Sequence, residues 1–153
     1  MSPRYDVRPG RNIHAGTRWG GMGVVAYEIR WEAPNGFYAH FTGWVTPESA
    51  ARLARELTSD PRYDDLRYAI VDLSDAPGHT FRRNDRAIGE AMVELIGAGF
   101  SNQNVHEIAI ATDTRLLNFL ETYARYTPRP FRIFATLDES RRWLAEQKFS
   151  SSP

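Results

Sequence analysis

The sequence contains no cysteine. This absence excludes disulfide bonds, thiolate catalysis and thiolate metal sites together. The 19 basic and 19 acidic residues cancel, so the molecule as a whole has no long-range attraction to nucleic acid or to an anionic membrane. No apolar run approaches the ~18 residues of a spanning helix, and the first residues lack the apolar core of a signal peptide. We therefore expect a soluble, cytoplasmic protein without a membrane span.

Lysine is almost absent, because all but one of the 19 basic residues are arginine. Four arginines lie within residues 1–20 against one aspartate, and prolines and glycines interrupt any periodicity there. We expect a flexible basic N-terminal tail over 1–20, a single domain over 21–148 and a frayed C-terminal tail over 149–153. Nucleic-acid binding through the arginine tail is one alternative function, although the tail lacks interleaved aromatic residues.

The stretch that organises the chain is RYAIVDLSDAPG, at positions 67–78. Its apolar run is nearly unbroken and β-branched at the centre, and it ends abruptly in Asp, Ser, Pro and Gly residues. Such a run predicts a strand over 67–73 that is buried on both faces, as in the middle of a parallel sheet. Ligands usually bind where such strands end, at the carboxyl edge of an open α/β sheet.

Residues 25–31 alternate apolar and polar side chains, and a second alternating stretch covers 37–45. The turn APNG at 33–36 joins them into an antiparallel hairpin whose first strand lies at or near an edge. Thr46-Pro47 then begins a helix, because a hydroxyl caps the first amides and proline suits the first helical position. Asp60-Pro61 ends that helix.

Three βα units follow the hairpin helix. After the central strand, we expect a helix from Asn84 or Asp85 that Gly97 and Gly99 end, and a short buried strand over 106–112. A helix over 115–126 stops before Pro128, a last strand covers 131–135, and a capping box at Thr136 begins a helix over 137–147. The order β-β-α-β-α-β-α-β-α predicts an α/β fold: a five-stranded mixed sheet with an antiparallel first strand and helices packed on the sheet.

Polar residues gather directly after the central strand, and we take them as the candidate ligand-binding site. They are Asp72, Ser74, Asp75, His79, Thr80, Arg82 and Arg83. Asp72 and Asp75 form either a carboxylate pair or ordinary strand-end turn polarity. The arginines form either an anion site or a solvated cluster.

An enzyme remains an alternative at the same place. A small hydrolase-like α/β enzyme would use Asp72, Ser74, Asp75 and His79, with His79 and Asp75 converging on a hydroxyl. No Gly-x-Ser-x-Gly elbow accompanies them. The four histidines show no i, i+3 or i+4 spacing, so we predict no metal site, and no glycine-rich phosphate loop or cofactor motif is present.

Aromatic residues exceed what a small five-stranded sheet needs. We expect most of them in the core and the remainder in a groove for an apolar ligand or in a dimer contact. The set comprises Trp31, Phe37, Phe41, Trp44, Phe119, Tyr123 and Tyr126.

This element order, with GWVT at 43–46, VDLS at 71–74 and ARYTPRPFRIFATLDESRRWL at 124–144, resembles the STAS (sulfate transporter and anti-sigma factor antagonist) superfamily. It is most similar to the SpoIIAA-like branch, which also resembles the lipid-binding CRAL-TRIO fold. The resemblance covers about residues 22–147. It implies a non-catalytic, bacterial regulatory or ligand-binding module without a cofactor. Its partner would be another protein, a second copy of the chain, or a small apolar or lipid-like molecule at the rim of the sheet.

One departure from the family pattern concerns phosphorylation. Anti-sigma antagonists carry a phosphorylatable serine in an Asp-Ser-Ser-Gly phrase at the start of the helix after the third strand. Residues 77–81 read PGHTF at that place, so the phrase is absent. Thr80, next to Arg82 and Arg83, is the nearby hydroxyl that a phosphoswitch would use.

Overall fold

The computed structural model describes residues 26–82 and 85–147. They form one five-stranded sheet in the order β1-β2-β3-β4-β5, in which β1 runs antiparallel to β2 and the other neighbours are parallel. The strands are β1 (Tyr27–Glu32), β2 (Gly36–Phe41), β3 (Tyr68–Asp72), β4 (His106–Ile110) and β5 (Phe131–Phe134). The helices are α1 (Pro47–Ser59), α2 (Arg86–Ser101), α3 (Thr114–Tyr126) and α4 (Leu137–Glu146), with a 3₁₀ turn η1 (Pro61–Asp65). The predicted fold class is confirmed.

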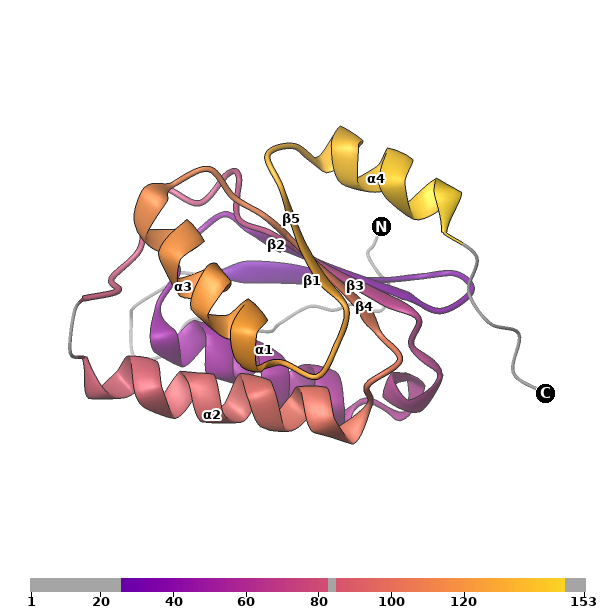
Figure 1. Cartoon of the computed structure of the whole chain (residues 1–153), viewed down its shortest axis with the longest axis horizontal. Helices are drawn as coiled ribbons and strands as arrows, with labels where there is room; N and C mark the ends of the chain where they lie inside the picture. Colours follow the sequence, from indigo (N-terminus) through magenta and orange to yellow (C-terminus); the bar gives the residue numbers. More distant parts are fainter. Residues whose placement is uncertain (1–25, 83–84, 148–153) are drawn as a thin grey trace.

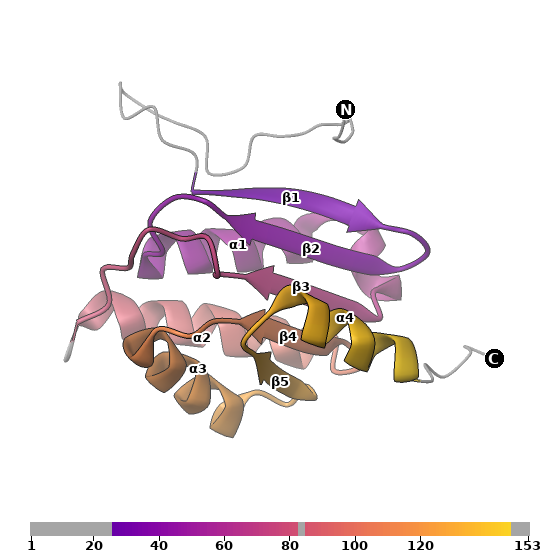
Figure 2. The same cartoon turned by 90° about the horizontal axis from the view of Figure 1, so that it is seen from above.

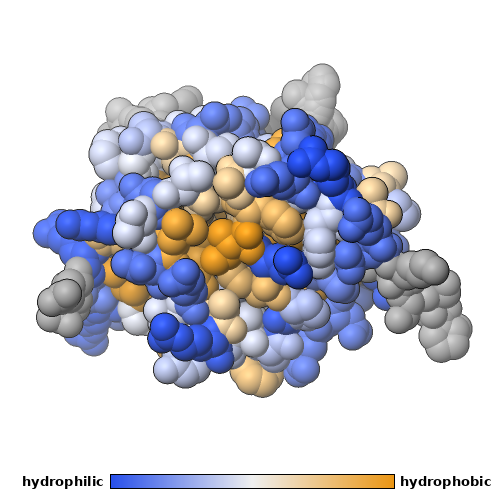
Figure 3. Space-filling model, turned by 45° about the horizontal axis from the view of Figure 1, so that its top comes forward, coloured by the Kyte–Doolittle hydropathy of each residue, from blue (hydrophilic) through white to orange (hydrophobic). Residues whose placement is uncertain are grey.

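Three helices cover one face of the sheet and one covers the other. Helices α1, α2 and α3 lie on one side, and α4 lies alone among the described helices on the opposite side (Figures 1 and 2). The larger core cluster lies under the three helices and contains Phe37, Ala69 and Leu120. The smaller one, around Ile70 and Ile108, packs against α4. On the face displayed in Figure 3, hydrophobic side chains gather near the middle and hydrophilic ones surround them.

The central strand and the helix starts follow the sequence signals. Ala69 and Ile70, which point to opposite faces of β3, are both almost fully buried, as expected for the middle of a parallel sheet. Thr46 accepts a hydrogen bond from the Ser49 amide in a capping box, and Thr136 does the same for Glu139. β1 is an edge strand, as its alternation indicates.

The ends of one helix and one strand differ from the prediction. Gly97 and Gly99 do not end α2, which continues to Ser101, because glycine weakens a helix interior without removing its amide. A Cβ at position 99 would lie 3.0 Å from Pro128 Cδ, so Gly99 permits the close approach of the chain after α3. The second strand ends at Phe41, not at residue 45, and Val45 instead forms an isolated parallel bridge with His79.

The predicted tails 1–20 and 149–153 lie outside the described residues, as do the ends of the predicted domain at 21–25 and 148. Within the described ranges, no helix is long and apolar enough to cross a membrane.

Candidate functional site

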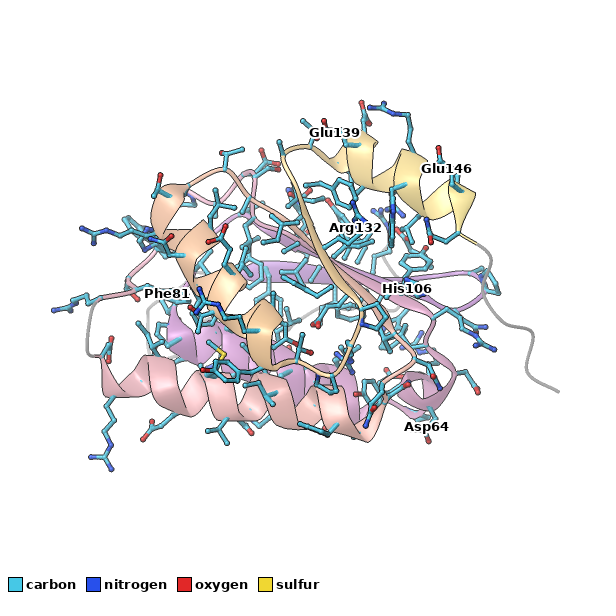
Figure 4. The ribbon with its side chains drawn as sticks, in the orientation of Figure 1. Asp64, Phe81, His106, Arg132, Glu139 and Glu146 are labelled. Atoms are coloured by element: carbon cyan, nitrogen blue, oxygen red, sulfur yellow. The ribbon has the colours of Figure 1, made fainter. Side chains whose placement is uncertain are left out.

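The candidate residues follow β3 at the edge where the parallel strands end, which we call the rim. Two loops meet there: the Val45 amide donates to the Gly78 carbonyl (2.9 Å), and the Thr80 amide donates to the Val45 carbonyl (3.0 Å). The Trp44 ring covers Gly78 so closely that a Cβ at position 78 would lie 2.5 Å from it, and half of Trp44 remains exposed. In Figure 4, Phe81 lies toward this end of the sheet, whereas Asp64 and His106 lie toward the other end.

Asp72 and Ser74 lie together and are hydrogen-bonded. Asp72 is 3% exposed and accepts hydrogen bonds from the Tyr38 hydroxyl (2.8 Å), the Ser74 amide (3.0 Å) and the Ser74 hydroxyl (2.6 Å). Burial, together with the hydrogen bond to Asp72, raises the pKa of the Tyr38 phenol. These hydrogen bonds stabilise a turn at the end of β3. The role of Asp72 that the contacts explain is therefore structural.

The two rim histidines have separate carboxylate partners. His40 Nε2 lies 2.7 Å from Asp75 Oδ2, and His79 Nε2 lies 3.1 Å from Asp113 Oδ1. His79 Nδ1 also accepts the Phe81 amide at 3.3 Å, so both of its ring nitrogens are engaged. The hydrogen bonds from the amides of α3, first that of Leu116, hold the pKa of Asp113 below its usual value.

These pairings do not assemble the hydrolase-like alternative. Asp75 pairs with His40 instead of His79, and the Ser74 hydroxyl donates to Asp72. That alternative needs His79 within hydrogen-bond reach of a hydroxyl, and the described contacts join His79 to neither Ser74 nor Thr80. Across residues 26–82 and 85–147, no three His, Asp or Glu side chains gather as a metal site.

Thr80 and Arg82 have exposed side chains on the loop that leads to α2. Arg83 lies outside the described residues. The N-cap of α2 is Asp85, whose carboxylate accepts the Ala87 amide at 2.9 Å. The start of α2 therefore carries a carboxylate rather than a hydroxyl, and Thr80 precedes it by five positions.

An open hollow of about 930 Å³ lies between the beginnings of α2 and α3 and includes Arg82. Apolar side chains supply one part of its lining and polar ones the rest. The lining residues are Phe81, Arg82, Asp85, Ile88, Met92, Arg115, Asn118, Phe119 and Thr122. Within the described part of the chain, Arg82 and Arg115 form no ion pair with another residue, and both side chains are exposed.

A smaller apolar cavity of about 70 Å³ lies beneath this hollow, inside the core between the sheet and the helices. Phe81 and Phe119 line both spaces, and their rings meet edge to face with centroids 4.5 Å apart. The aromatic pair therefore separates an open amphipathic hollow from a buried apolar one. Phe119 belongs to the aromatic set from which a groove was expected, whereas Arg115, Asn118 and Thr122 of the hollow were not predicted; their signal is their spacing around Phe119 on α3.

The opposite end of the parallel strands holds a buried polar group that sequence reasoning also missed. We call it the amino-end cluster: Tyr63, Asn102, Glu107, Tyr123 and Arg129. The Arg129 side chain is 1% exposed and donates to the carbonyls of Asn102 (2.9 Å) and Ala98 (3.1 Å) and to the Tyr63 hydroxyl. Glu107 lies 3.5 Å from Arg129 and accepts the Tyr123 hydroxyl at 2.6 Å.

The comparisons with known proteins agree with this topology. The unphosphorylated anti-sigma factor antagonist SpoIIAA superposes with a TM-score of 0.51 at 10% identity, over 80% of this chain and the whole of SpoIIAA. The chain has the SpoIIAA fold. A proposed anti-sigma factor antagonist from Thermotoga maritima superposes on 78% of the chain and 95% of its own length, with a TM-score of 0.50 and 13% identity. No protein-family model and no curated protein sequence matches the chain.

This result confirms the resemblance to SpoIIAA at the level of the fold. At these identities, the likeness to SpoIIAA concerns the arrangement of the backbone and assigns no activity.

Proposed function

We propose that the protein is a non-catalytic regulatory or ligand-binding module that takes a small apolar or lipid-like molecule in the hollow between α2 and α3. The observation that carries the proposal is the pairing of an apolar floor, Phe81 and Phe119, with two exposed arginines, Arg82 and Arg115, in one hollow at the rim. Small-molecule sites in proteins commonly measure about 300–1,000 Å³ and combine apolar walls with a few polar groups. The hollow has this size and composition.

Its charges favour an acidic head group. Arg82 and Arg115 face the hollow as two cations, while Asp85 supplies one carboxylate that the Ala87 amide already engages. An apolar body would lie on the two phenylalanine rings. The smaller cavity beneath, about 70 Å³, is less than half of the ~150 Å³ that holds a benzene ring, so the ligand would stay in the outer hollow.

The first experiment is native mass spectrometry of the protein as purified from cells. We expect a stoichiometric additional mass in the lipid or metabolite range. A second measurement uses anilinonaphthalene sulfonate, which has an apolar ring system and one acidic group, and follows its fluorescence on titration with protein. We expect Arg82→Gln with Arg115→Gln to weaken binding about tenfold or more, at roughly 1 kcal/mol for each charged hydrogen bond lost.

The control is Arg125→Gln, because Arg125 is also an exposed arginine of α3 but does not line the hollow. It should bind the probe like the unchanged protein. Equal binding by all three proteins, combined with a bare mass from cells, would contradict the proposed ligand site.

A second candidate is a partner protein docking on the rim, favoured by Trp44. This side chain is 52% exposed and fixed over Gly78, and tryptophan is enriched at the centres of protein interfaces. SpoIIAA, which shares the fold, is an anti-sigma factor antagonist. We expect a stoichiometric complex isolated from cells that Trp44→Ser abolishes and the double arginine variant preserves; survival of the complex in Trp44→Ser would rule out this docking surface.

Phosphorylation of Thr80 remains a prediction. The exposed hydroxyl is accessible to a kinase, and a phosphate there would add about −1.5 to −2 charges next to Arg82. Phosphate mapping of the protein from cells checks it, and a modification confined to other positions would contradict it.

A further inference from the structure

The outward face of α2 carries large apolar side chains and glycines among its charged residues, whereas the outer face of a surface helix is ordinarily polar throughout. Val93 is 72% exposed and Phe100 is 60% exposed, and Gly89 and Gly97 are exposed between and beside them. These positions lie on one stripe of the helix, because they are separated by three or four residues. Val93 and Phe100 are two of the four large hydrophobic residues that are exposed in the described chain, the others being Trp44 and Tyr126.

The end of α3 lies close to the end of α2, because Thr127 and Pro128, which follow α3, lie against Gly99 of α2. Tyr126, the last residue of α3, is 61% exposed. Exposed apolar area that is concentrated in this way usually marks an interaction surface.

The two glycines of the stripe have no role inside the protein. A Cβ at Gly89 or at Gly97 would meet nothing within 4 Å, so alanine would fit at both positions. Glycine in a helix interior is nevertheless less stable than alanine. Glycine does provide a flat surface that a second backbone can approach closely. Gly99, by contrast, already has a close neighbour within the chain, at Thr127 and Pro128.

The stripe is symmetric about Val93. Arg86 and Phe100 lie seven residues to either side of it, and Gly89 and Gly97 lie four residues to either side. A two-fold interface places each surface residue against its counterpart, so a helix with this symmetry fits an antiparallel copy of itself. We propose that two copies of this chain pair through α2, with the two-fold axis at Val93.

In this pairing each Gly89 faces the other copy's Gly97, which lets the helices approach, and the two Val93 side chains meet. Each Arg86 guanidinium lies over the other copy's Phe100 ring, a favourable cation–π arrangement. Arg86 is 93% exposed and carries only a 3.4 Å ion pair with Glu90, so it is available for that contact. The complementary features are thus a cation facing an aromatic ring and glycine facing glycine.

The surface is small, so the dimer should be concentration-dependent. Stable interfaces bury about 1,200–2,000 Å² in total, and the proposed contact consists of a single pair of 16-residue helices. The proposal is independent of the ligand proposed for the hollow, because α2 presents its outer stripe on one side and Ile88 and Met92 to the hollow on another.

Because the sequence contains no cysteine, a single cysteine introduced into the whole chain allows a disulfide cross-linking test. We expect Val93→Cys to form a disulfide-linked dimer on mild oxidation, since the proposed axis brings the two positions close enough for a disulfide. Ala145→Cys, on the exposed side of α4, is the matched control and should give less than about a tenth as much dimer, as expected where no specific contact holds two copies together. Equal cross-linking of both variants, or none, would overturn the proposal.

Sedimentation equilibrium gives the second test. Val93→Glu and Val93→Arg should each be monomeric, because like charges meet at the axis, and an equimolar mixture of the two should regain dimer. Gly89→Leu should weaken self-association at least about tenfold while the melting temperature stays the same or rises. A monomeric unchanged protein over the whole concentration range, or a mixture that stays monomeric, would refute the α2 pair.

Discussion

The two ends of the parallel strands differ in how far their polar side chains are buried and in how those side chains are paired. At the rim, histidine and carboxylate side chains form separate pairs that are in part exposed, as in His40 with Asp75. At the amino end, Arg129 is buried, the Glu107 side chain is 12% exposed, and both share their partners with two tyrosines. Buried polar groups are costly unless every partner is present, whereas exposed pairs contribute little to stability. We therefore expect the amino end to hold the fold and the rim to remain free for binding.

The largest effect should follow from removing the guanidinium of the amino-end cluster. Arg129→Met leaves Glu107 and the Tyr63 hydroxyl without their cationic partner in a buried site, which typically costs about 3–5 kcal/mol. Urea unfolding measures the loss. Arg132→Met, on the same segment but exposed, should cost less than about 1 kcal/mol. Similar losses for both variants would remove the contrast between the two ends.

A smaller effect should separate two aspartates within the rim. Asp72→Ala leaves the buried Tyr38 hydroxyl and the Ser74 groups without an acceptor, which costs about 1–3 kcal/mol. Asp75→Ala removes only an exposed pair with His40 and should change the free energy of unfolding by less than about 0.5 kcal/mol. Equal values would mean that Asp72, too, is free to act at the rim.

The pH dependence of stability gives a third contrast, at the amino end. Burial opposes the ionisation of Glu32, but hydrogen bonds from Arg141 and Tyr68 outweigh it and hold the pKa of Glu32 below its usual value of 4.5. The unfolded chain therefore binds this proton more readily, so the contribution is present above pH 4.5 and is lost as pH falls through the lower folded pKa. The stability difference between the unchanged protein and Glu32→Gln should shrink on acidification; a difference that grows would contradict this sign.

The smallest effect concerns Arg82 of the rim. Arg82→Gln should leave the free energy of unfolding within about 0.5 kcal/mol, because no ion pair of the described chain depends on its exposed side chain. Its binding phenotype, if the hollow takes an acidic ligand, would then arise without any loss of stability. A substantial destabilisation, seen in the same urea titration, would place Arg82 with the residues that hold the fold.

Local signals sufficed for most of the architecture. The apolar run of β3, the alternation in β1 and the caps at Thr46 and Thr136 act over a few residues, so the sequence displays them directly. The end of α2 was misplaced because glycine acts through its surroundings. Whether Gly99 stops a helix or admits Pro128 depends on a segment about thirty residues away.

The place of the candidate residues in the fold was predictable, but their contacts were not. Chain order places Asp72 to Arg82 at the rim. In the structure, however, His79 pairs with neither Asp72 nor Asp75, the two aspartates that precede it in this stretch. Its partner Asp113 comes from the loop after β4, and Arg115 of the hollow from the helix that follows. Such partners are set by the register of parallel strands, which separates contacts by the length of a whole βα unit. The amino-end cluster was missed for the same reason.

The two hydrogen bonds that join Val45 to the loop after β3 have a mechanical consequence. Val45 directly precedes the capping threonine of α1, so the two loops and the first turn of that helix form one stiff unit. A molecule that displaced Gly78 or Thr80 would therefore also displace the start of α1. Occupancy of the rim would thereby be transmitted as a change in amide exchange at Thr46 to Ala50, on a helix that does not itself line the hollow between α2 and α3.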